Sequence, residues 1–269
     1  MYFYSEKEGI GKTGFFNWLI DEVISDNYCV MCDMNKVLSK FNSTLDKNLL
    51  CVFNETKEFG EEYTENDKLK SIISDYKLII ENKGLDCRKI TNNSKQIILS
   101  NNINSVKIKK NDRRYCVLEL NNTYACNKTY FNQFYKIDLN QTSACAFYNY
   151  LMNIDIDGWD HEKMPITNIK IEIMRSNRNY VEKFLFDLYN NEYEHDLLEL
   201  NNDKTISSST LYMIFIDWHK KNGLPKPLSS HSFVNRLYEI IPRQKVNYNN
   251  KRVNRVIINK KIIENALNK

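Results

Sequence analysis

The stretch Gly9-Ile10-Gly11-Lys12-Thr13 constrains the fold of this 269-residue chain more than any other feature. An apolar run at residues 1–4 precedes it, and apolar residues at helical spacing follow it over residues 16–24. The order strand, glycine loop, helix predicts a phosphate-binding loop, since backbone N–H groups of such a loop point at an anion. Lys12 would then reach the β- and γ-phosphates of a nucleotide, and Thr13 would bind Mg²⁺.

One position departs from this pattern. Glu6 stands where a phosphate-binding loop has its first glycine. A carboxylate 4 Å from the γ-phosphate would repel it by about 1 kcal/mol in water, and by more in a desolvated site. We interpret Glu6 as a residue that begins the turn and points outward.

The composition fits a folded, reduced protein. Hydrophobic residues make up 42% of the chain, and no apolar run reaches the length of a membrane span. No signal peptide precedes the first strand, so we expect a soluble, intracellular protein without a membrane partner. Seven cysteines, an odd number, indicate free thiols. Cys29 and Cys32 form a CxxC, but they lie in an expected strand with no second ligand pair, so we interpret them as core residues rather than zinc ligands.

Charge is distributed unevenly along the chain. Residues 205–269 contain 12 Lys or Arg against 3 Asp or Glu, a net charge of +9, whereas the remainder carries 26 against 31, a net charge of −5. A basic C-terminal segment on a mildly acidic body indicates an acidic partner for that segment.

Residues 1–125 have the pattern of an α/β domain with a parallel sheet. We expect strands at residues 1–4, 28–32, 49–53, 96–100 and 115–120, a helix at 64–74, and a hairpin at 77–91 that turns at Lys83-Gly84. Residues 126–200 predict a helical extension, including a helix capped by Ser176 or Asn177.

Residues 205–269 predict two helices, a basic hairpin and a short final helix. This order is typical of a winged-helix-like DNA-binding domain. Lys251, Arg252 and Arg255 lie in the hairpin and are its candidate DNA-binding residues.

Several polar residues follow the expected strands and are candidate catalytic groups. Glu55 follows the buried strand at 49–53, where it could activate the attacking water, and the neighbouring Asn54 could bind Mg²⁺ through a water molecule. Asn101 could present an amide to the γ-phosphate, although asparagine ends many strands. Arg113 and Arg114 precede a strand, and one of them could neutralise charge on a neighbouring subunit's nucleotide; the alternative is a pair of solvated arginines.

The order of these motifs resembles the superfamily 3 helicases, and most closely the helicase part of phage and poxvirus-type primase-helicases. The resemblance covers residues 1–190 and continues into the basic C-terminal region. It implies an AAA+-like P-loop ATPase that binds ATP and Mg²⁺, forms a hexameric ring of identical subunits and moves along single-stranded DNA. It also implies that Lys12 and Thr13 are the Walker A residues, Glu55 the Walker B carboxylate, Asn101 the sensor and Arg113 or Arg114 the arginine finger.

The same resemblance implies that Lys83 grips single-stranded DNA from its hairpin; the alternative is an ordinary tight turn with a solvated lysine. The sequence contains no primase domain and no helical segment before residue 1, so a separate primase or N-terminal helicase piece is an expected partner. Glu6 and Asn54 motivate an alternative function, that of a catalytically impaired DNA-binding accessory protein. A small-molecule kinase would leave the arginine pair and the basic segment unexplained.

Overall fold

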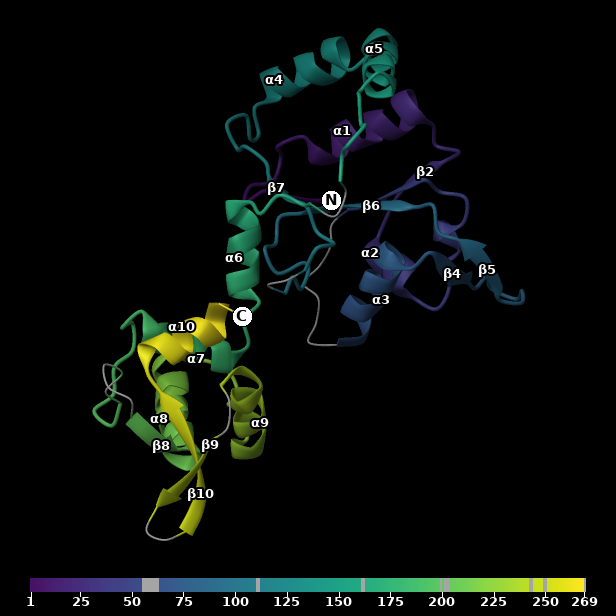
Figure 1. Cartoon of the computed structure of the whole chain (residues 1–269). Coiled ribbons are helices and arrows are strands. Elements are labelled where there is room, and N and C mark those ends of the chain that lie inside the picture. The colour runs from purple at the N-terminus through teal and green to yellow at the C-terminus, as the bar shows by residue number, and fades with distance from the viewer. Residues whose placement is uncertain are drawn as a thin grey trace. The chain divides into compact units, whose positions relative to one another are not determined.

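The computed structural model divides the chain into two compact units, Met1–Asn177 and Arg178–Lys269 (Figure 1). It describes residues 1–54, 63–109, 112–160, 163–198, 200, 204–241, 244–248 and 251–268; for a few of these, mostly in β8, β9 and β10, only the backbone is described.

A five-stranded parallel sheet forms the centre of the first unit. Its strand order is β2-β3-β6-β1-β7, with β2 at Cys29–Cys32, β3 at Leu50–Phe53, β6 at Lys95–Ser100, β1 at Tyr2–Tyr4 and β7 at Val117–Glu119. The expected α/β class and all five expected strands are therefore confirmed. Since the strands are parallel, their carboxyl ends meet at one edge of the sheet.

Because successive side chains of a strand point to opposite faces, the residues of the sheet belong to two apolar clusters, one on each face. Val52 and Leu99 pack with Phe16 on the face covered by α1 (Lys12–Trp18) and the π-helical segment η1 (Leu19–Ile24). The other face is covered by α2 (Met34–Leu38), the short η2 (Ser43–Leu45), α3 (Tyr63–Ser74) and α6 (Asn168–Ser176), as Figure 1 shows.

The CxxC pair follows this alternation. Cys29 belongs to the cluster around Phe16, whereas Cys32 packs against the cluster on the opposite face. Both thiols are free, and the described residues contain no group of three or more His, Cys, Asp or Glu that could bind a metal. The geometry agrees with core cysteines.

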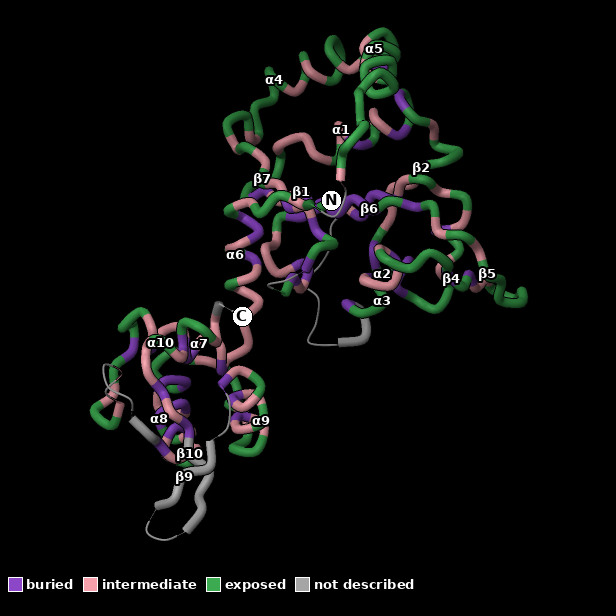
Figure 2. The backbone as a smooth tube through the Cα atoms, viewed as in Figure 1, coloured by how far each residue is buried: buried purple, intermediate pink, exposed green. Residues whose placement is uncertain are grey.

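Two further features of the first unit lie outside the sheet. The antiparallel hairpin β4 (Lys77–Ile80) and β5 (Arg88–Thr91) forms where it was expected. A helical segment follows β7 and comprises α4 (Lys128–Gln133), the π-helical η3 (Phe134–Asp138) and α5 (Gln141–Met152). Most residues of α4 and α5 are exposed (Figure 2).

The second unit packs helices against a three-stranded antiparallel sheet of order β8-β10-β9. Its elements are α7 (Tyr180–Tyr189), β8 (Lys204–Ser207), α8 (Ser208–Lys221), α9 (Ser230–Ile240), β9 (Gln244–Tyr248), β10 (Lys251–Ile258) and α10 (Lys260–Asn268). Four aromatic rings fill its core: Phe184, Phe215, Trp218 and Phe233. The expected helices and hairpin are confirmed, and β8 adds a strand that the sequence did not indicate.

The expected cap at Ser176 or Asn177 is wrong. Helix α6 ends at Ser176, and Asn179 caps α7 instead. The Asn179 side chain accepts hydrogen bonds from the backbone N–H groups of Val181 (2.9 Å) and Glu182 (3.0 Å), while Glu182 Oε2 accepts one from the Asn179 N–H at 2.8 Å. This reciprocal capping box needs a glutamate three residues after the cap, a spacing that only Asn179 provides. As a result α7 begins in the second unit, whereas α6 belongs to the first.

No helix among the described residues is both long enough and apolar enough to span a bilayer.

Candidate nucleotide-binding site

The glycine loop connects the end of β1 to the start of α1. Gly9 (φ 68°) and Gly11 (φ 86°) both have positive φ, a conformation that side chains with a Cβ adopt at a cost. Gly11 is also the residue before α1, and a Cβ atom there would overlap the ring of Phe131. The two glycines are therefore required by backbone conformation at both positions and by close packing at Gly11.

Lys12 points from the start of α1 across the loop. Its Nζ donates to the Ser5 hydroxyl and to the Ser100 carbonyl oxygen, the latter at 3.5 Å. Burial lowers the pKa of Lys12 to about 8, and the nearby Glu8 carboxylate opposes this shift. Burial removes water from the Lys12 ammonium and replaces it with a few neutral acceptors, which disfavours the charged form. An anion bound beside the ammonium would stabilise the charged form again.

Thr13 and Asn54 meet beside the loop. The Thr13 hydroxyl donates to Asn54 Oδ1 at 3.3 Å, and Asn54 directly follows β3. Both side chains offer oxygen atoms, the type of ligand that Mg²⁺ takes in proteins, usually together with carboxylates, phosphates and water. The two residues therefore fit a magnesium site, whereas Glu55 lies outside the described residues.

Asn101 lies between these groups because β6 pairs with β1 on one side and with β3 on the other. Its side-chain amide donates to the Ser5 carbonyl (2.8 Å) and to the Lys7 carbonyl (2.7 Å) of the glycine loop. In this conformation Asn101 therefore fixes the entrance of the loop.

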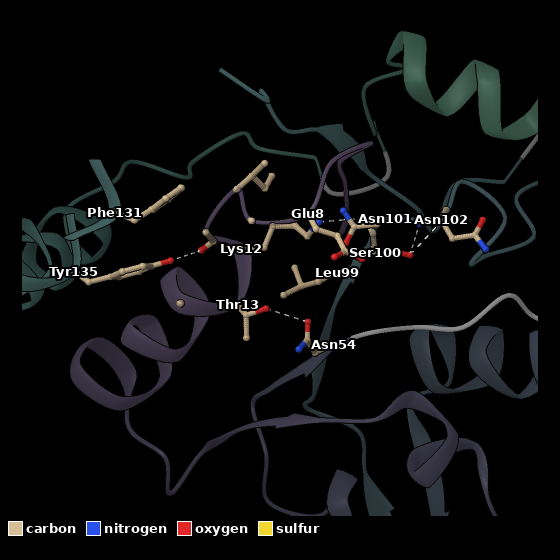
Figure 3. Close-up of a pocket in the computed structure, with 14 residues that line it drawn as sticks. Glu8, Lys12, Thr13, Asn54, Leu99, Ser100, Asn101, Asn102, Phe131 and Tyr135 are labelled. Atoms are coloured by element: carbon tan, nitrogen blue, oxygen red, sulfur yellow. Dashed lines mark hydrogen bonds between the residues drawn. The ribbon is translucent and has the colours of Figure 1, made fainter. Parts of the chain in front are cut away.

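These residues line a cavity of about 740 Å³ at the carboxyl edge of the sheet (Figure 3). The cavity is lined by the loop from Glu8 to Gly14, by Asn54, by the end of β6 and by two aromatic residues. Its volume lies within the usual range for small-molecule sites, and α/β sheets bind ligands at this edge. The structure thus brings Gly9, Ile10, Gly11, Lys12, Thr13, Asn54 and Asn101 together, as the sequence predicted.

Glu6 is exposed and does not line the cavity, in agreement with its expected outward position. Instead, Glu8 lines the cavity, and its negative charge raises the pKa of Lys12 against the larger effect of burial. The sequence pattern did not indicate Glu8, because the loop consensus specifies the residue at the position of Glu6 and leaves that of Glu8 open.

An aromatic wall on the segment after β7 was also missed. Phe131 of α4 and Tyr135 of η3 line the cavity, and the Tyr135 hydroxyl donates to the Gly11 carbonyl at 3.3 Å. The Cys126 N–H donates to the Gly9 carbonyl at 3.0 Å, so this segment contacts the loop at two points. The sequence could have indicated these two residues, because the i, i+4 spacing of Phe131 and Tyr135 places both rings on one helix face.

Arg113 and Arg114 lie away from this cavity in their own chain. They precede β7, whose start is at the sheet edge opposite the end of β1, because Tyr2 pairs with Val117 and Tyr4 with Glu119. Both residues are exposed, and the Arg114 Nε donates to the Ser74 hydroxyl at 2.7 Å. The structure does not bring either arginine to the glycine loop of the same chain.

The candidate DNA-binding residues are in two places. Lys83 is exposed in the turn of the β4–β5 hairpin, next to Gly84, which has φ 79°. Lys251, Arg252 and Arg255 belong to β10, where the backbone pairs Lys251 and Arg252 with β9 and Arg255 with both β9 and β8.

Two family models match the chain, one within each of its two compact units, apart from Asn177 at the boundary. Residues 3–114 match a family of unknown function, DUF5906, and residues 177–268 match the family described as Poxvirus D5 protein-like. No curated protein matches the chain. The C-terminal match supports the poxvirus part of the expected resemblance for residues 177–268, whereas the residues that carry the nucleotide-site motifs match a family of unknown function.

The fold resembles solved structures of another protein region. The apo structure of the NrS-1 C-terminal region (305–718) superposes with a TM-score of 0.67 at 20% identity, and the alignment covers 96% of this chain and 66% of that one. An A-form apo structure of the same region gives the same values. At this identity the likeness shows the shared fold alone, and the similarity to the Poxvirus D5 protein-like family rests on the match of residues 177–268.

Proposed function

We propose that the chain is an ATP-dependent DNA helicase or translocase module that acts in the replication of a virus, phage or plasmid-type replicon. The observation that carries this proposal is the convergence of Lys12, the Thr13–Asn54 pair and Asn101 on one cavity beside a glycine loop. The similarity to the Poxvirus D5 protein-like family supports a replication role and the superfamily 3 assignment.

In this proposal each residue of the cavity has a role in binding or orientation. The N–H groups of Gly9–Thr13 and the Lys12 ammonium bind the phosphates of ATP. Thr13 and Asn54 bind Mg²⁺, Asn54 through water, and this ion would neutralise charge on the phosphates. Glu55 would orient the attacking water, and Asn101 would contact the γ-phosphate after releasing the loop carbonyls.

Two further roles depend on other molecules. An arginine from a neighbouring subunit, Arg113 or Arg114, would complete the site in a hexameric ring; their position at the far edge of the sheet is compatible with action between chains. Single-stranded DNA would contact Lys83 and the C-terminal unit, in which we propose a winged-helix-like arrangement of α8, α9 and the β9–β10 hairpin. A separate primase or N-terminal helicase piece is a further proposed partner.

The first test is the ATPase activity of the full chain with and without single-stranded DNA. We expect DNA to stimulate hydrolysis, and Lys12→Ala to lower the rate by about 10²–10³-fold because it removes a donor to the transferred phosphate. Lys7→Ala is the matched control, since Lys7 is an exposed lysine of the same loop whose contribution to the loop contacts is its carbonyl oxygen.

Glu55→Gln separates binding from chemistry. It should abolish hydrolysis and leave nucleotide affinity nearly unchanged. If the wild-type chain has no ATPase activity but binds DNA tightly without nucleotide, the accessory-protein alternative replaces the enzyme. Activity that survives both Lys12→Ala and Glu55→Gln would exclude this cavity as the catalytic site.

A further inference from the structure

A second cavity of about 360 Å³ lies against the glycine loop. Four residues line both this cavity and the first one: Ile10, Gly11, Lys12 and Phe131. The remaining walls come from β1, from the first turns of α1, and from the segment between β7 and η3. The two cavities are thus neighbours that share the glycine loop as a common wall.

The chemistry of the second cavity differs from that of the first. Its lining is dominated by aromatic rings, among them Phe3, Tyr124 and Phe131. Lys12, which is shared with the first cavity, is the one charged side chain among its lining residues, and Asn121 provides a side-chain amide. A cavity of this kind accepts a flat, largely apolar ligand with a few polar atoms at its edge.

The aromatic wall is fixed in place by the loop itself. Tyr135 donates to the Gly11 carbonyl and the Cys126 N–H donates to the Gly9 carbonyl, so the segment is hydrogen-bonded to the loop at positions before and after Phe131 in the sequence. Tyr124 stacks on Tyr130 with ring centroids 4.0 Å apart and an angle of 6° between the rings. The lining rings therefore have defined orientations before any ligand binds, which lowers the entropic cost of binding.

We infer that the second cavity binds the base of the nucleotide whose phosphates bind at the glycine loop, with Phe131 and Tyr124 providing aromatic contact faces. This inference rests on the proposed nucleotide site. A nucleotide consists of a charged chain and a flat heterocycle, and here a polar cavity with Lys12 adjoins an aromatic one across a shared wall. Each part of the ligand thus meets a surface of matching chemistry.

The test compares two ligands that share phosphates but differ in the base. The full chain is titrated by calorimetry in the presence of Mg²⁺ with tripolyphosphate and with the β,γ-imido analogue of ATP. Base–aromatic stacking changes affinity by about 5- to 150-fold per base. We therefore expect the wild-type chain to bind the ATP analogue at least about tenfold more tightly than tripolyphosphate.

Two substitutions probe the aromatic rings that line the second cavity. Tyr124→Ala removes a ring that is 50% exposed, and Phe131→Leu keeps apolar volume against Gly11 but removes the flat face. Each should weaken the ATP analogue about tenfold, and Tyr124→Ala, whose ring lines the second cavity but not the first, should leave tripolyphosphate affinity within about twofold. Phe131→Tyr should retain analogue affinity. Tyr148→Ala is the matched control, because Tyr148 is a 46% exposed tyrosine of α5 that does not line the cavity.

The outcomes separate this inference from the proposed function. Equal affinities of the wild-type chain for the two ligands, or equal losses of affinity for both ligands in Tyr124→Ala, would overturn the base site without overturning the phosphate site. Absence of binding for both ligands in the wild-type chain would overturn the nucleotide site and the base site together. Unchanged tripolyphosphate affinity in Tyr124→Ala also shows that this variant has folded.

Discussion

At the scale of single residues, Lys12 combines a charge with a partly desolvated position. Its Nζ donates to the neutral oxygen atoms of Ser5 and Ser100, and burial lowers its pKa to about 8, with Glu8 opposing the shift. In the ligand-free protein Lys12 is therefore charged below pH 8 and loses its proton as the pH rises above that value. A bound phosphate favours the charged form, so binding above pH 8 takes up a proton.

We predict that affinity for Mg²⁺-tripolyphosphate falls as the pH rises from 7.5 to 9.5, with a slope that approaches about tenfold per pH unit above pH 8. Calorimetry in buffers of different ionisation enthalpy would also detect the proton uptake. Lys12→Arg is the control, because a guanidinium keeps its charge across this range. A similar pH dependence in Lys12→Arg would assign the effect to another group.

At the scale of elements, the capping box of α7 is a local interaction that stabilises the start of a core helix. Asn179 and Glu182 exchange hydrogen bonds at the start of a helix that supplies Phe184 to the core of the second unit. Loss of the Asn179 side chain leaves two backbone N–H groups without their acceptor. This loss reduces the stability of the second unit without removing any apolar contact.

Asn179→Ala should lower the free energy of unfolding of the second unit by about 1 kcal/mol, whereas Asn179→Ser, which preserves an acceptor, should cost only a few tenths of that amount. Urea denaturation followed by Trp218 fluorescence measures this, in a background with Trp18→Phe and Trp159→Phe. Equal losses in the two variants would show that the capping hydrogen bonds contribute little.

The elements also show what the sequence could predict and what it could not. The five sheet strands and the Lys12–Thr13 site followed from apolar runs and a glycine motif, which are local patterns. Strand β8 was missed because its residues, Lys204–Ser207, are mostly polar and the strand exists through pairing with β10. The aromatic wall was missed because contact between Phe131 and Gly11 depends on tertiary packing of a segment that follows the sheet.

At the scale of the whole molecule, each unit supplies candidate DNA-binding residues, namely Lys83 in the first and Lys251, Arg252 and Arg255 in the second. The net charge of +9 over residues 205–269 favours nucleic acid, and binding of this kind weakens as salt rises, since bound phosphates release their counterions. The enzyme proposal requires the Lys83 turn to contact DNA, whereas the accessory-protein alternative requires only the C-terminal unit.

We predict that Lys83→Ala reduces the magnitude of the slope of log affinity against log salt concentration for single-stranded DNA by about 0.7 per chain. The combined variant Lys251→Ala, Arg252→Ala, Arg255→Ala should reduce it by about three times as much. Fluorescence anisotropy over a salt series measures both. Lys36→Ala, an exposed lysine of α2, is the control. An unchanged slope in Lys83→Ala, with a reduced slope in the combined variant, would favour the accessory protein.

The central position of β1 has a consequence for how the first unit folds. Tyr2 pairs with Ile98 on one side and with Val117 on the other, which are contacts between residues on the order of 100 positions apart. The glycine loop after β1 lies at the edge of a sheet only when β6 and β7 have both paired with β1. Bringing β1 together with these distant strands costs chain entropy before the new contacts compensate for it. We therefore expect folding of this unit to be limited by chain closure, and Gly9–Thr13 to acquire their conformation late although they precede almost all of the sheet in the sequence.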